Sequence, residues 1–327
     1  MARRSNRISP LSLPVSAHHG WQVVVVCMRL TGLLCLAWVA LGVSGCASPI
    51  DPSEDRSGPI SSPPPSLNTE SGGAITSAAP PVTFTSPDYG IQVFLFWREE
   101  VADRDLQLVR EAGLRWVKQG FAWREIEGAG RGIYDWSNAD RLMDQVDAHG
   151  LHIIARVDAQ PAWAGGGYPL IGPPDDPQDY VNFLTALATR YRGRIDAYQI
   201  WNEPNLAREW GGRPPSPGEY TRLLTLAYTA IKSVDPRAVV ISAGMAPTTR
   251  HDAAAMPDTV YIQGMYDAGA APYFDLLGVH GAGYRAAPET APEQVAADPQ
   301  LNHNDASPPE LRRIYRFRHV EDVRAVM

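Results

Sequence analysis

Apolar runs alternate with amphipathic stretches along the chain from residue 90 onward. Short, nearly continuous apolar runs begin near residues 91, 115, 151, 195, 238 and 276. A breaker precedes each of the last five runs, and the breakers follow one another at intervals of about 40 residues: Gly113, Gly150, Gly193, Pro236 and Asp275. Because glycine just past a helix end releases the chain into its next segment, this pattern predicts a repeating unit of strand, helix and breaker.

Two helix starts are visible inside this repeat. Asp176 is a capping residue placed before Pro177, which suits the first position of a helix. Ser216 is followed three residues later by Glu219, the spacing of a capping box. Apolar residues at helical spacing follow both starts, so we expect helices from these two points.

Strand–helix alternation at this period predicts an α/β fold with a parallel sheet and crossover helices. Two architectures fit, an open doubly wound sheet and a closed (β/α)8 barrel of the TIM type. No glycine-rich phosphate loop follows the first strand, residues 91–97, which argues against nucleotide binding. Polar or aromatic residues end nearly every run, which favours a barrel because a barrel's active site gathers all its strand-end loops: Trp97, Trp123, Asp158, Asn202, Glu203 and His280.

The N-terminal segment has the pattern of an export signal. Arg29 precedes the apolar stretch Leu33–Leu41, which is short for a transmembrane helix and suits a signal core. The next residues, Val43-Ser44-Gly45-Cys46, resemble the lipobox of bacterial lipoproteins. This resemblance implies that residues 1–45 are a signal region, removed before Cys46, and that the thiol of Cys46 is acylated. An uncleaved anchor is the alternative, and Met28 would make a more ordinary start for the signal.

Residues 46–88 follow as a segment dominated by Pro, Ser, Gly and Thr. Such a composition cannot bury a core, so we expect a disordered tether with a reach of about 35 Å. The sequence therefore predicts a domain over residues 89–327, held off the outer face of a bacterial cell membrane by a lipid anchor.

Composition narrows the function classes. The chain has 327 residues, is 44% hydrophobic and carries a formal charge of −7, so a nucleic-acid partner is not expected. All of its cysteines (Cys27, Cys35 and Cys46) precede the predicted domain, which leaves that domain without a disulfide. The histidines lack metal-binding spacing and there is no Gly-x-Ser-x-Gly elbow, so we expect no metal or other cofactor. The sequence does not indicate an oligomeric state.

Motifs at the predicted strand ends resemble those of the retaining glycoside hydrolases of clan A, especially families 39 and 5 (cellulase-like). Trp123–Glu127 and Gly132–Trp136 resemble the second βα unit, and Pro161–Trp163 the loop after the third strand. Trp201-Asn202-Glu203-Pro204-Asn205 matches the fourth-strand motif, the most specific of the set, and Asp275–His280 the sixth strand. Their order and spacing agree with the family from residue 90 to about residue 285.

The resemblance gives Glu203 the role of acid/base. Retaining glycosidases also need a carboxylate nucleophile about 5–5.5 Å away, and hydrogen bonds to the sugar 2-hydroxyl, here assigned to Asn202. As an acid, Glu203 would need a raised pKa; a surface or ion-paired carboxylate is the alternative. Since successive strand residues point to opposite faces, Asn202 and Glu203 can both face a pocket only if the strand end is irregular.

The resemblance also implies substrate-binding residues. His280 would lie in the cleft, with Tyr284 beside it; a buried, satisfied histidine and a packing tyrosine are the alternatives. Trp163 and Trp210 are candidates for stacking on sugar faces, although packing is as good an interpretation of both. Trp97 would line the pocket, as would Arg156 and Asp158 unless they pair with each other.

In clan A the nucleophile is a glutamate at the end of the seventh strand. The pattern gives six strands, then a polar loop from Arg285 to Pro309 and a sixth helix from Leu311. We therefore expect a barrel truncated after its sixth βα unit, with the nucleophile absent from this chain and with negligible turnover by the chain alone.

Three functions remain. The first is a lipid-anchored glycosidase that hydrolyses O-glycosyl bonds in poly- or oligosaccharides by a retaining mechanism. The second is a non-catalytic carbohydrate-binding lipoprotein. A lyase with a Schiff-base lysine is the third, but Lys118 has no aldolase-like context. The sequence does not specify the sugar, the linkage or the choice between endo and exo cleavage.

Overall fold

The computed structural model describes residues 88–327. The predicted signal region, the predicted acylation of Cys46 and the predicted tether lie outside the described residues and stay predictions. Among residues 88–327, no helix has the length and apolar character needed to cross a membrane.

Residues 88–327 contain one five-stranded sheet, and all of its neighbouring strands are parallel. Its strands are β1 (Gly90–Val93), β2 (Trp116–Ala122), β3 (His152–Asp158), β4 (Ala197–Ile200) and β5 (Val239–Ile241). They pair in consecutive order, β1-β2-β3-β4-β5. This order confirms the α/β fold with barrel-type connections, because a doubly wound sheet reverses its strand order near the middle.

The sixth predicted strand is not a regular strand. The segment Leu276–Val279 runs parallel to β5 and the residues after it, but it pairs through two isolated bridges, Leu276 with Ile241 and Val279 with Met245, rather than through a continuous ladder. The Ser242 hydroxyl, rather than a backbone carbonyl, accepts the Gly278 N–H at 3.0 Å. Because this side-chain bond replaces a ladder bond, the expectation of a continuous sixth strand is wrong, although the direction of the segment is the one predicted.

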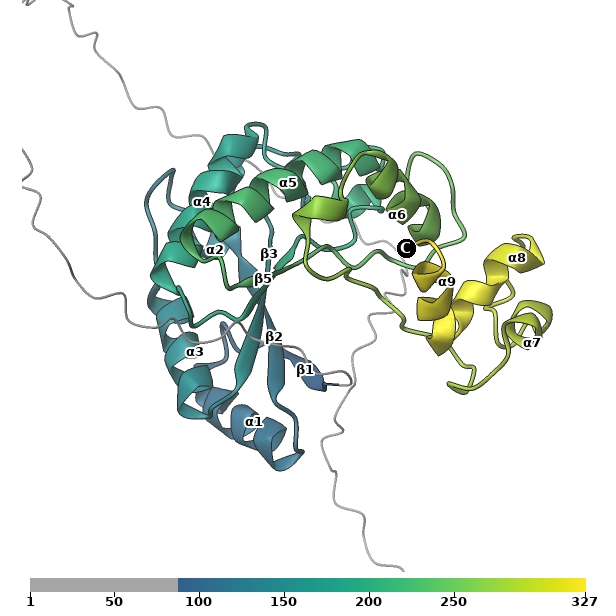
Figure 1. The fold of residues 1–327 in the computed structure, drawn as a ribbon, viewed down its shortest axis with the longest axis horizontal. Helices are drawn as coiled ribbons and strands as arrows, with labels where there is room; N and C mark the ends of the chain where they lie inside the picture. Colours follow the sequence, from purple (N-terminus) through teal and green to yellow (C-terminus); the bar gives the residue numbers. More distant parts are fainter. Residues whose placement is uncertain (1–87) are drawn as a thin grey trace, which may run out of the picture. The chain divides into compact units, whose positions relative to one another are not determined.

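Helices cover the outer face of the sheet in an arc (Figure 1). They are α1 (Glu99–Glu111), the short α2 (Trp123–Ile126), α3 (Ser137–Ala148), α4 (Pro177–Arg190), α5 (Pro217–Val234) and α6 (Asp258–Asp267). Both predicted helix starts are confirmed: the Asp176 carboxylate accepts the Gln178 N–H, and the Ser216 hydroxyl accepts the Glu219 N–H.

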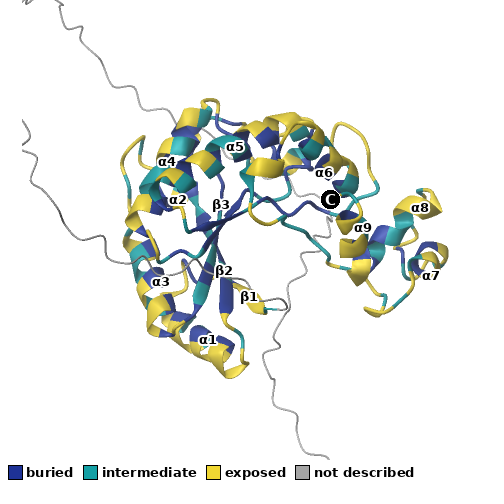
Figure 2. Ribbon diagram, viewed as in Figure 1, coloured by how far each residue is buried: buried dark blue, intermediate teal, exposed yellow. Residues whose placement is uncertain are grey.

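Alternate strand residues build the core. In β3, Ile153, Ala155 and Val157 are fully buried, and they face the helices together with Val117 and Phe121 of β2. The residues between them point to the inner face and are less buried. Figure 2 shows the same division, with the buried residues where helices meet the sheet and exposed residues on the helices' outer sides. Several side chains on the inner face of β2 and β3 are therefore only partly buried and can contact solvent.

The C-terminal segment differs from its prediction. The expected polar loop contains α7 (Pro292–Ala297), and the expected single helix is divided into α8 (Pro309–Arg312), two short 3-10 turns and α9 (Val320–Arg324). The interruption occurs at Arg316, whose backbone is extended and whose buried guanidinium forms ion pairs with Glu321 and Asp322. Pairing this buried charge takes precedence over helix continuity, because an unpaired buried charge is costly.

Candidate active site

The chain leaves regular strand geometry just before the Asn–Glu pair. Strand β4 ends at Ile200, and both Trp201 (φ 71°) and Glu203 (φ 47°) adopt left-handed conformations. The Glu203 N–H donates to the Gly244 carbonyl at 3.1 Å instead of continuing the ladder. The strand end is thus irregular, which removes the alternation that would have sent Asn202 and Glu203 to opposite faces.

Trp201 holds this irregular turn in place. Its ring is fully buried, and its Nε1–H donates to the Glu209 carbonyl at 2.9 Å. The Trp201 ring packs edge-on against Tyr180, with centroids 5.7 Å apart, and against Trp210 at 6.0 Å. Buried aromatic pairs of this geometry add about 0.5–1.5 kcal/mol beyond the area that they bury.

Trp210 does not have the sugar-stacking role considered from the sequence. Its ring is fully buried between Trp201 and Tyr220, and its Nε1–H reaches the Glu219 carboxylate at 3.2 Å. A ring without exposed surface cannot receive a sugar, so the stacking expectation is wrong and the packing alternative holds.

Glu203 and His280 lie in contact at the strand ends. His280 Nδ1 lies 2.9 Å from Glu203 Oε1, and both side chains are mostly buried. Gly244 makes this approach possible, because a Cβ atom there would lie 2.4 Å from the His280 ring. Arg208 Nη2 contacts the other oxygen, Glu203 Oε2, at 3.4 Å.

The charge state of Glu203 differs from the expectation. Burial alone would raise the pKa of its carboxyl, but the hydrogen bond and charge of His280 and the charge of Arg208 outweigh burial. The net effect is a pKa below the ordinary glutamate value. The raised pKa expected for an acid is therefore not found in this arrangement, in which His280 and Arg208 stabilise the carboxylate form.

A second carboxylate, missed by the sequence analysis, belongs to the same site. Glu209 ends a 3-10 turn over Ala207–Glu209, and its Oε1 lies 3.5 Å from Arg208 Nε. Burial, the charge of Glu203 and the charge of Asp158 raise the pKa of Glu209, and Arg208 only partly offsets them. Its position in the same strand-end loop, six residues after Glu203, was the signal available in the sequence.

The inner face of the sheet carries further charges below this site. Asp158 is fully buried and forms an ion pair with Arg156 at 2.9 Å, which was the alternative left open for these two residues. Burial, together with the nearby charge of Arg156, lowers the pKa of Lys118 to about 8, although Asp158 and Glu203 oppose the change. Groups of both charge signs therefore lie close together below Glu203, and Lys118 and Asp158 each affect the pKa of the other.

Asn202 and Trp97 keep surface that a ligand could use. Asn202 is half-buried, and its side chain makes no hydrogen bond to any of residues 88–327. Trp97 follows β1, is 53% exposed, and donates from Nε1 to Glu125 Oε2 at 3.3 Å. Both remain compatible with the sugar contacts predicted for them.

Trp163 and Tyr284 are engaged in packing. The Trp163 Nε1–H donates to the Glu127 carbonyl at 2.6 Å, and its ring meets Trp123 edge-on and Arg131 at 5.4 Å. The Tyr284 ring packs against two rings of the C-terminal segment, His303 at 5.0 Å and Tyr315 at 6.3 Å. Tyr284 is therefore held by neighbours other than His280, and one face of Trp163 is occupied by a guanidinium.

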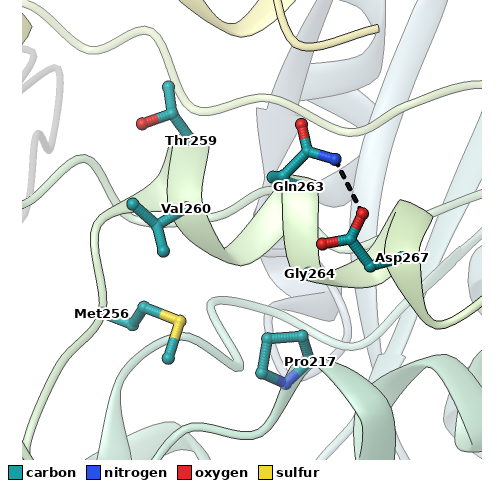
Figure 3. A pocket seen from close by; sticks show the side chains of 7 residues that line it. All are labelled: Pro217, Met256, Thr259, Val260, Gln263, Gly264 and Asp267. Atoms are coloured by element: carbon teal, nitrogen blue, oxygen red, sulfur yellow. Dashed lines mark hydrogen bonds between the residues drawn. The ribbon is translucent and has the colours of Figure 1, made fainter.

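Among residues 88–327, neither a metal site nor a surface hollow is part of the Glu203 site. Within residues 88–327, no cluster of three or more His, Cys, Asp or Glu side chains has the arrangement needed to hold a metal ion. A surface hollow of about 450 Å³ lies between the start of α5 and α6 (Figure 3), and Gln263 donates to Asp267 at its edge. None of the predicted site residues lines this hollow, so it is separate from the Glu203 site.

Comparisons with known proteins agree with the strand-end motifs. Residues 93–206 match the family model Glyco_hydro_42, described as beta-galactosidase, from β1 to just past the Asn–Glu pair. A curated relative, the beta-xylosidase of Geobacillus stearothermophilus, is 26% identical over 126 residues, which cover 34% of this chain and 25% of the relative. These matches confirm the predicted resemblance to clan A glycoside hydrolases.

Solved structures of glycoside hydrolases also align with the chain. A family 39 glycoside hydrolase from the gut symbiont Bacteroides cellulosilyticus WH2 aligns with a TM-score of 0.47 and 20% identity, over 62% of this chain and 39% of that one. A beta-galactosidase from the psychrophilic Marinomonas ef1 gives a TM-score of 0.42 and 13% identity, over 66% of this chain and 43% of that one. The chain thus spans a quarter of the curated relative's length and about two fifths of these solved chains.

Proposed function

We propose that this chain carries the acid/base half of a retaining glycosidase site that cleaves O-glycosyl bonds in poly- or oligosaccharides. The observation that supports the proposal most directly is the contact of Glu203 with His280, at 2.9 Å, between two strand ends. Glu203 is the acid/base, Asn202 holds the sugar 2-hydroxyl, and Trp97 offers an apolar surface to a sugar ring. The nucleophile is a second carboxylate that we do not assign among residues 88–327.

The lowered pKa of Glu203 fits one half of this cycle. In the deglycosylation step of a retaining mechanism the acid/base is a carboxylate that removes a proton from water, and the ionised form is then the one required. In the first step the same residue must be protonated. A bound sugar that displaces Arg208 from Glu203 would raise the pKa of Glu203 toward that requirement, because a nearby cation favours the charged form.

Cleavage of 4-nitrophenyl β-glycosides by the full chain tests the proposal, with galactose, xylose, glucose and mannose as the sugars. Sodium azide in excess stands in for the unassigned nucleophile: it attacks the anomeric carbon, the glycosidic bond breaks, and Glu203 protonates the departing oxygen. We expect azide-dependent release of nitrophenol from at least one glycoside, and negligible release without azide. With the matching phenyl glycosides, whose leaving group is poorer and needs the acid more, kcat/KM in azide should fall by about 100-fold for Glu203→Gln.

The control for Glu203→Gln is Glu111→Gln, which removes an exposed carboxylate on α1 and should leave the rate unchanged. Cleavage that survives Glu203→Gln would contradict the assignment. Binding of an oligosaccharide without cleavage, in the presence or absence of azide, would favour the second function, a non-catalytic carbohydrate-binding lipoprotein.

We also propose that Cys46 is acylated and anchors the domain to the outer face of a bacterial cell membrane. The support is the lipobox-like Val43-Ser44-Gly45-Cys46 after an apolar segment of signal length. With such an anchor, the proposed carbohydrate substrate would lie outside the cytoplasm.

A further inference from the structure

Two carboxylates of the site share one guanidinium. Arg208 Nη2 lies 3.4 Å from Glu203 Oε2, and Arg208 Nε lies 3.5 Å from Glu209 Oε1. Both distances are longer than a well-formed charge-assisted hydrogen bond of about 2.7–2.9 Å. The Arg208 side chain is 70% exposed, whereas Glu203 and Glu209 are only 21% and 20% exposed. A solvent-exposed cation thus spans two mostly buried carboxyl groups and is held tightly by neither.

The backbone around these residues is firmly bonded. The Leu206 N–H donates to the Glu203 carbonyl at 3.0 Å, and the Glu209 N–H donates to the Leu206 carbonyl at 2.9 Å. The Glu209 carbonyl in turn accepts the indole N–H of buried Trp201. The two carboxylates therefore keep their relative positions while the long arginine side chain can change its rotamer.

The charged groups around the pair differ in sign. Glu203 faces the His280 imidazole and the Arg208 guanidinium, with the Lys118 ammonium further below. Glu209 faces the carboxylates of Glu203 and Asp158, with Arg208 as its cation. These surroundings lower the pKa of Glu203 and raise that of Glu209. Pairs of carboxyl groups separated in this way are a common arrangement for dividing acid and base roles.

We propose that Glu209 is a positioning residue for Glu203, forming with it and Arg208 a coupled pair in which the contact made by Arg208 decides which carboxylate holds a proton. With Arg208 on Glu203, Glu209 is the carboxyl group that binds a proton more readily. When Arg208 moves fully to Glu209, Glu209 releases a proton and Glu203 takes one up, so the net charge of the pair is unchanged. This inference rests on the proposed acid/base role of Glu203, for which the pair supplies the protonated form.

The coupling predicts opposite shifts for two substitutions. Glu209→Gln removes a negative charge and leaves Arg208 to Glu203 alone, so the pKa of Glu203 should fall by about half a unit or more. Arg208→Gln removes the shared cation, so the pKa values of Glu203 and Glu209 should both rise by a similar amount. Because the groups interact, the wild-type pair should titrate in two steps that belong to the pair.

Carboxyl ¹³C NMR of glutamate-labelled full chain measures these titrations directly, with Glu203→Gln and Glu209→Gln used to assign the two signals. Glu209→Asp retains the charge and should keep the titration of Glu203 within about 0.3 units of the wild type. Glu111→Gln and Arg222→Gln, on exposed helix surfaces, should leave it unchanged. A titration of Glu203 that does not move in Glu209→Gln and Arg208→Gln overturns the pairing.

The pH dependence of glycoside cleavage separates this inference from the proposed function. If both hold, the alkaline limb of the pH–rate profile moves down in pH for Glu209→Gln and up for Arg208→Gln, in the same direction as the NMR titrations. NMR shifts of the predicted sign without any cleavage would support the pair and reject the glycosidase. Cleavage that needs Glu203, with NMR titrations insensitive to Glu209, would reject the pair and support the glycosidase.

Discussion

Single side chains fix the strand ends that carry the site. Tyr220 of α5 is the best example, because its buried hydroxyl donates to the Ile200 carbonyl at 2.9 Å and accepts the Ala243 N–H at 2.6 Å. One phenol therefore joins the end of β4 to the chain just after β5, directly before the Glu203 turn. Burial raises the pKa of Tyr220 far above its ordinary value, so the hydroxyl keeps its proton and remains a donor throughout the usual pH range.

Tyr220→Phe should lower the free energy of unfolding by about 2 kcal/mol. The substitution leaves a buried carbonyl and a buried N–H without their partner, and each such group costs about 1–3 kcal/mol. Urea denaturation followed by circular dichroism measures the loss.

Tyr228→Phe, on the same helix, is the matched control for Tyr220→Phe. The Tyr228 ring packs on Tyr273, and its hydroxyl has no hydrogen bond to any of residues 88–327, so the expected change is within about 0.5 kcal/mol. Equal losses for the two variants would show that the hydroxyl of Tyr220 does not carry this contribution.

At the scale of elements, one histidine connects the C-terminal segment to the main body of helices. Buried His319, just before α9, has Nε2 at 2.6 Å from Asp258 of α6 and Nδ1 at 3.0 Å from Asp322 of α9. Arg313 and Arg316 also contact Asp322, and Arg316 contacts Glu321. Burial disfavours the imidazolium, but hydrogen bonds to two carboxylates outweigh burial and raise the pKa of His319.

His319→Gln should therefore destabilise the fold in a pH-dependent way. A histidine whose folded pKa exceeds its unfolded value of about 6.5 contributes its full stabilisation below that pH, and loses it as pH rises through the folded pKa. We expect wild type to exceed the variant by about 2 kcal/mol near pH 6 and by less at each higher pH. Unfolding in urea at a series of pH values gives this difference.

His251→Gln is the control for His319→Gln, because His251 is exposed and has no hydrogen-bond or ion-pair partner to lose among residues 88–327. A gap between wild type and His319→Gln that stays constant, or grows, as pH rises would contradict a charged His319. Hydrogen exchange in α9 should also speed up in His319→Gln, since α9 packs on α6 through this contact.

For the whole molecule, patterns that depend on local periodicity were predictable from the sequence. The spacing of breakers predicted the parallel sheet, and the motifs predicted that Glu203 and His280 lie at the same end of it, although not their direct contact. What could not be predicted depends on the contacts of individual side chains rather than on periodicity. The hydroxyl of Ser242 replaces a ladder bond beside the sixth segment, and buried Arg316 interrupts the final helix.

The composition of the site shows the same limit. Trp210 and Glu209 are adjacent in the sequence. The motifs predicted a possible sugar-stacking role for Trp210, with packing as the alternative, and no role for Glu209. The structure buries Trp210 in a row of rings and directs Glu209 toward Arg208. Only the three-dimensional packing of Tyr180, Trp201 and Tyr220 decides which of the neighbours faces the site.

Attachment to a membrane is a property of the entire chain and has a direct test. In a bacterial host, Cys46→Ser should abolish incorporation of a radiolabelled fatty acid and move the protein from the membrane fraction to the soluble one. The reason is that several buried acyl chains hold a protein at a bilayer and none would remain. Cys35→Ser, inside the predicted signal, is the matched control and should be labelled normally; labelling of Cys46→Ser would contradict the predicted anchor.

The left-handed conformations of Trp201 and Glu203 have a consequence for selection. A non-glycine residue in this conformation costs on the order of 1 kcal/mol, which glycine would not pay. A laboratory screen that rewards thermal stability alone would therefore favour glycine at position 203, and the carboxylate would be among the first features lost. If Glu203 is the proposed acid/base, folding and chemistry make opposing demands at this position.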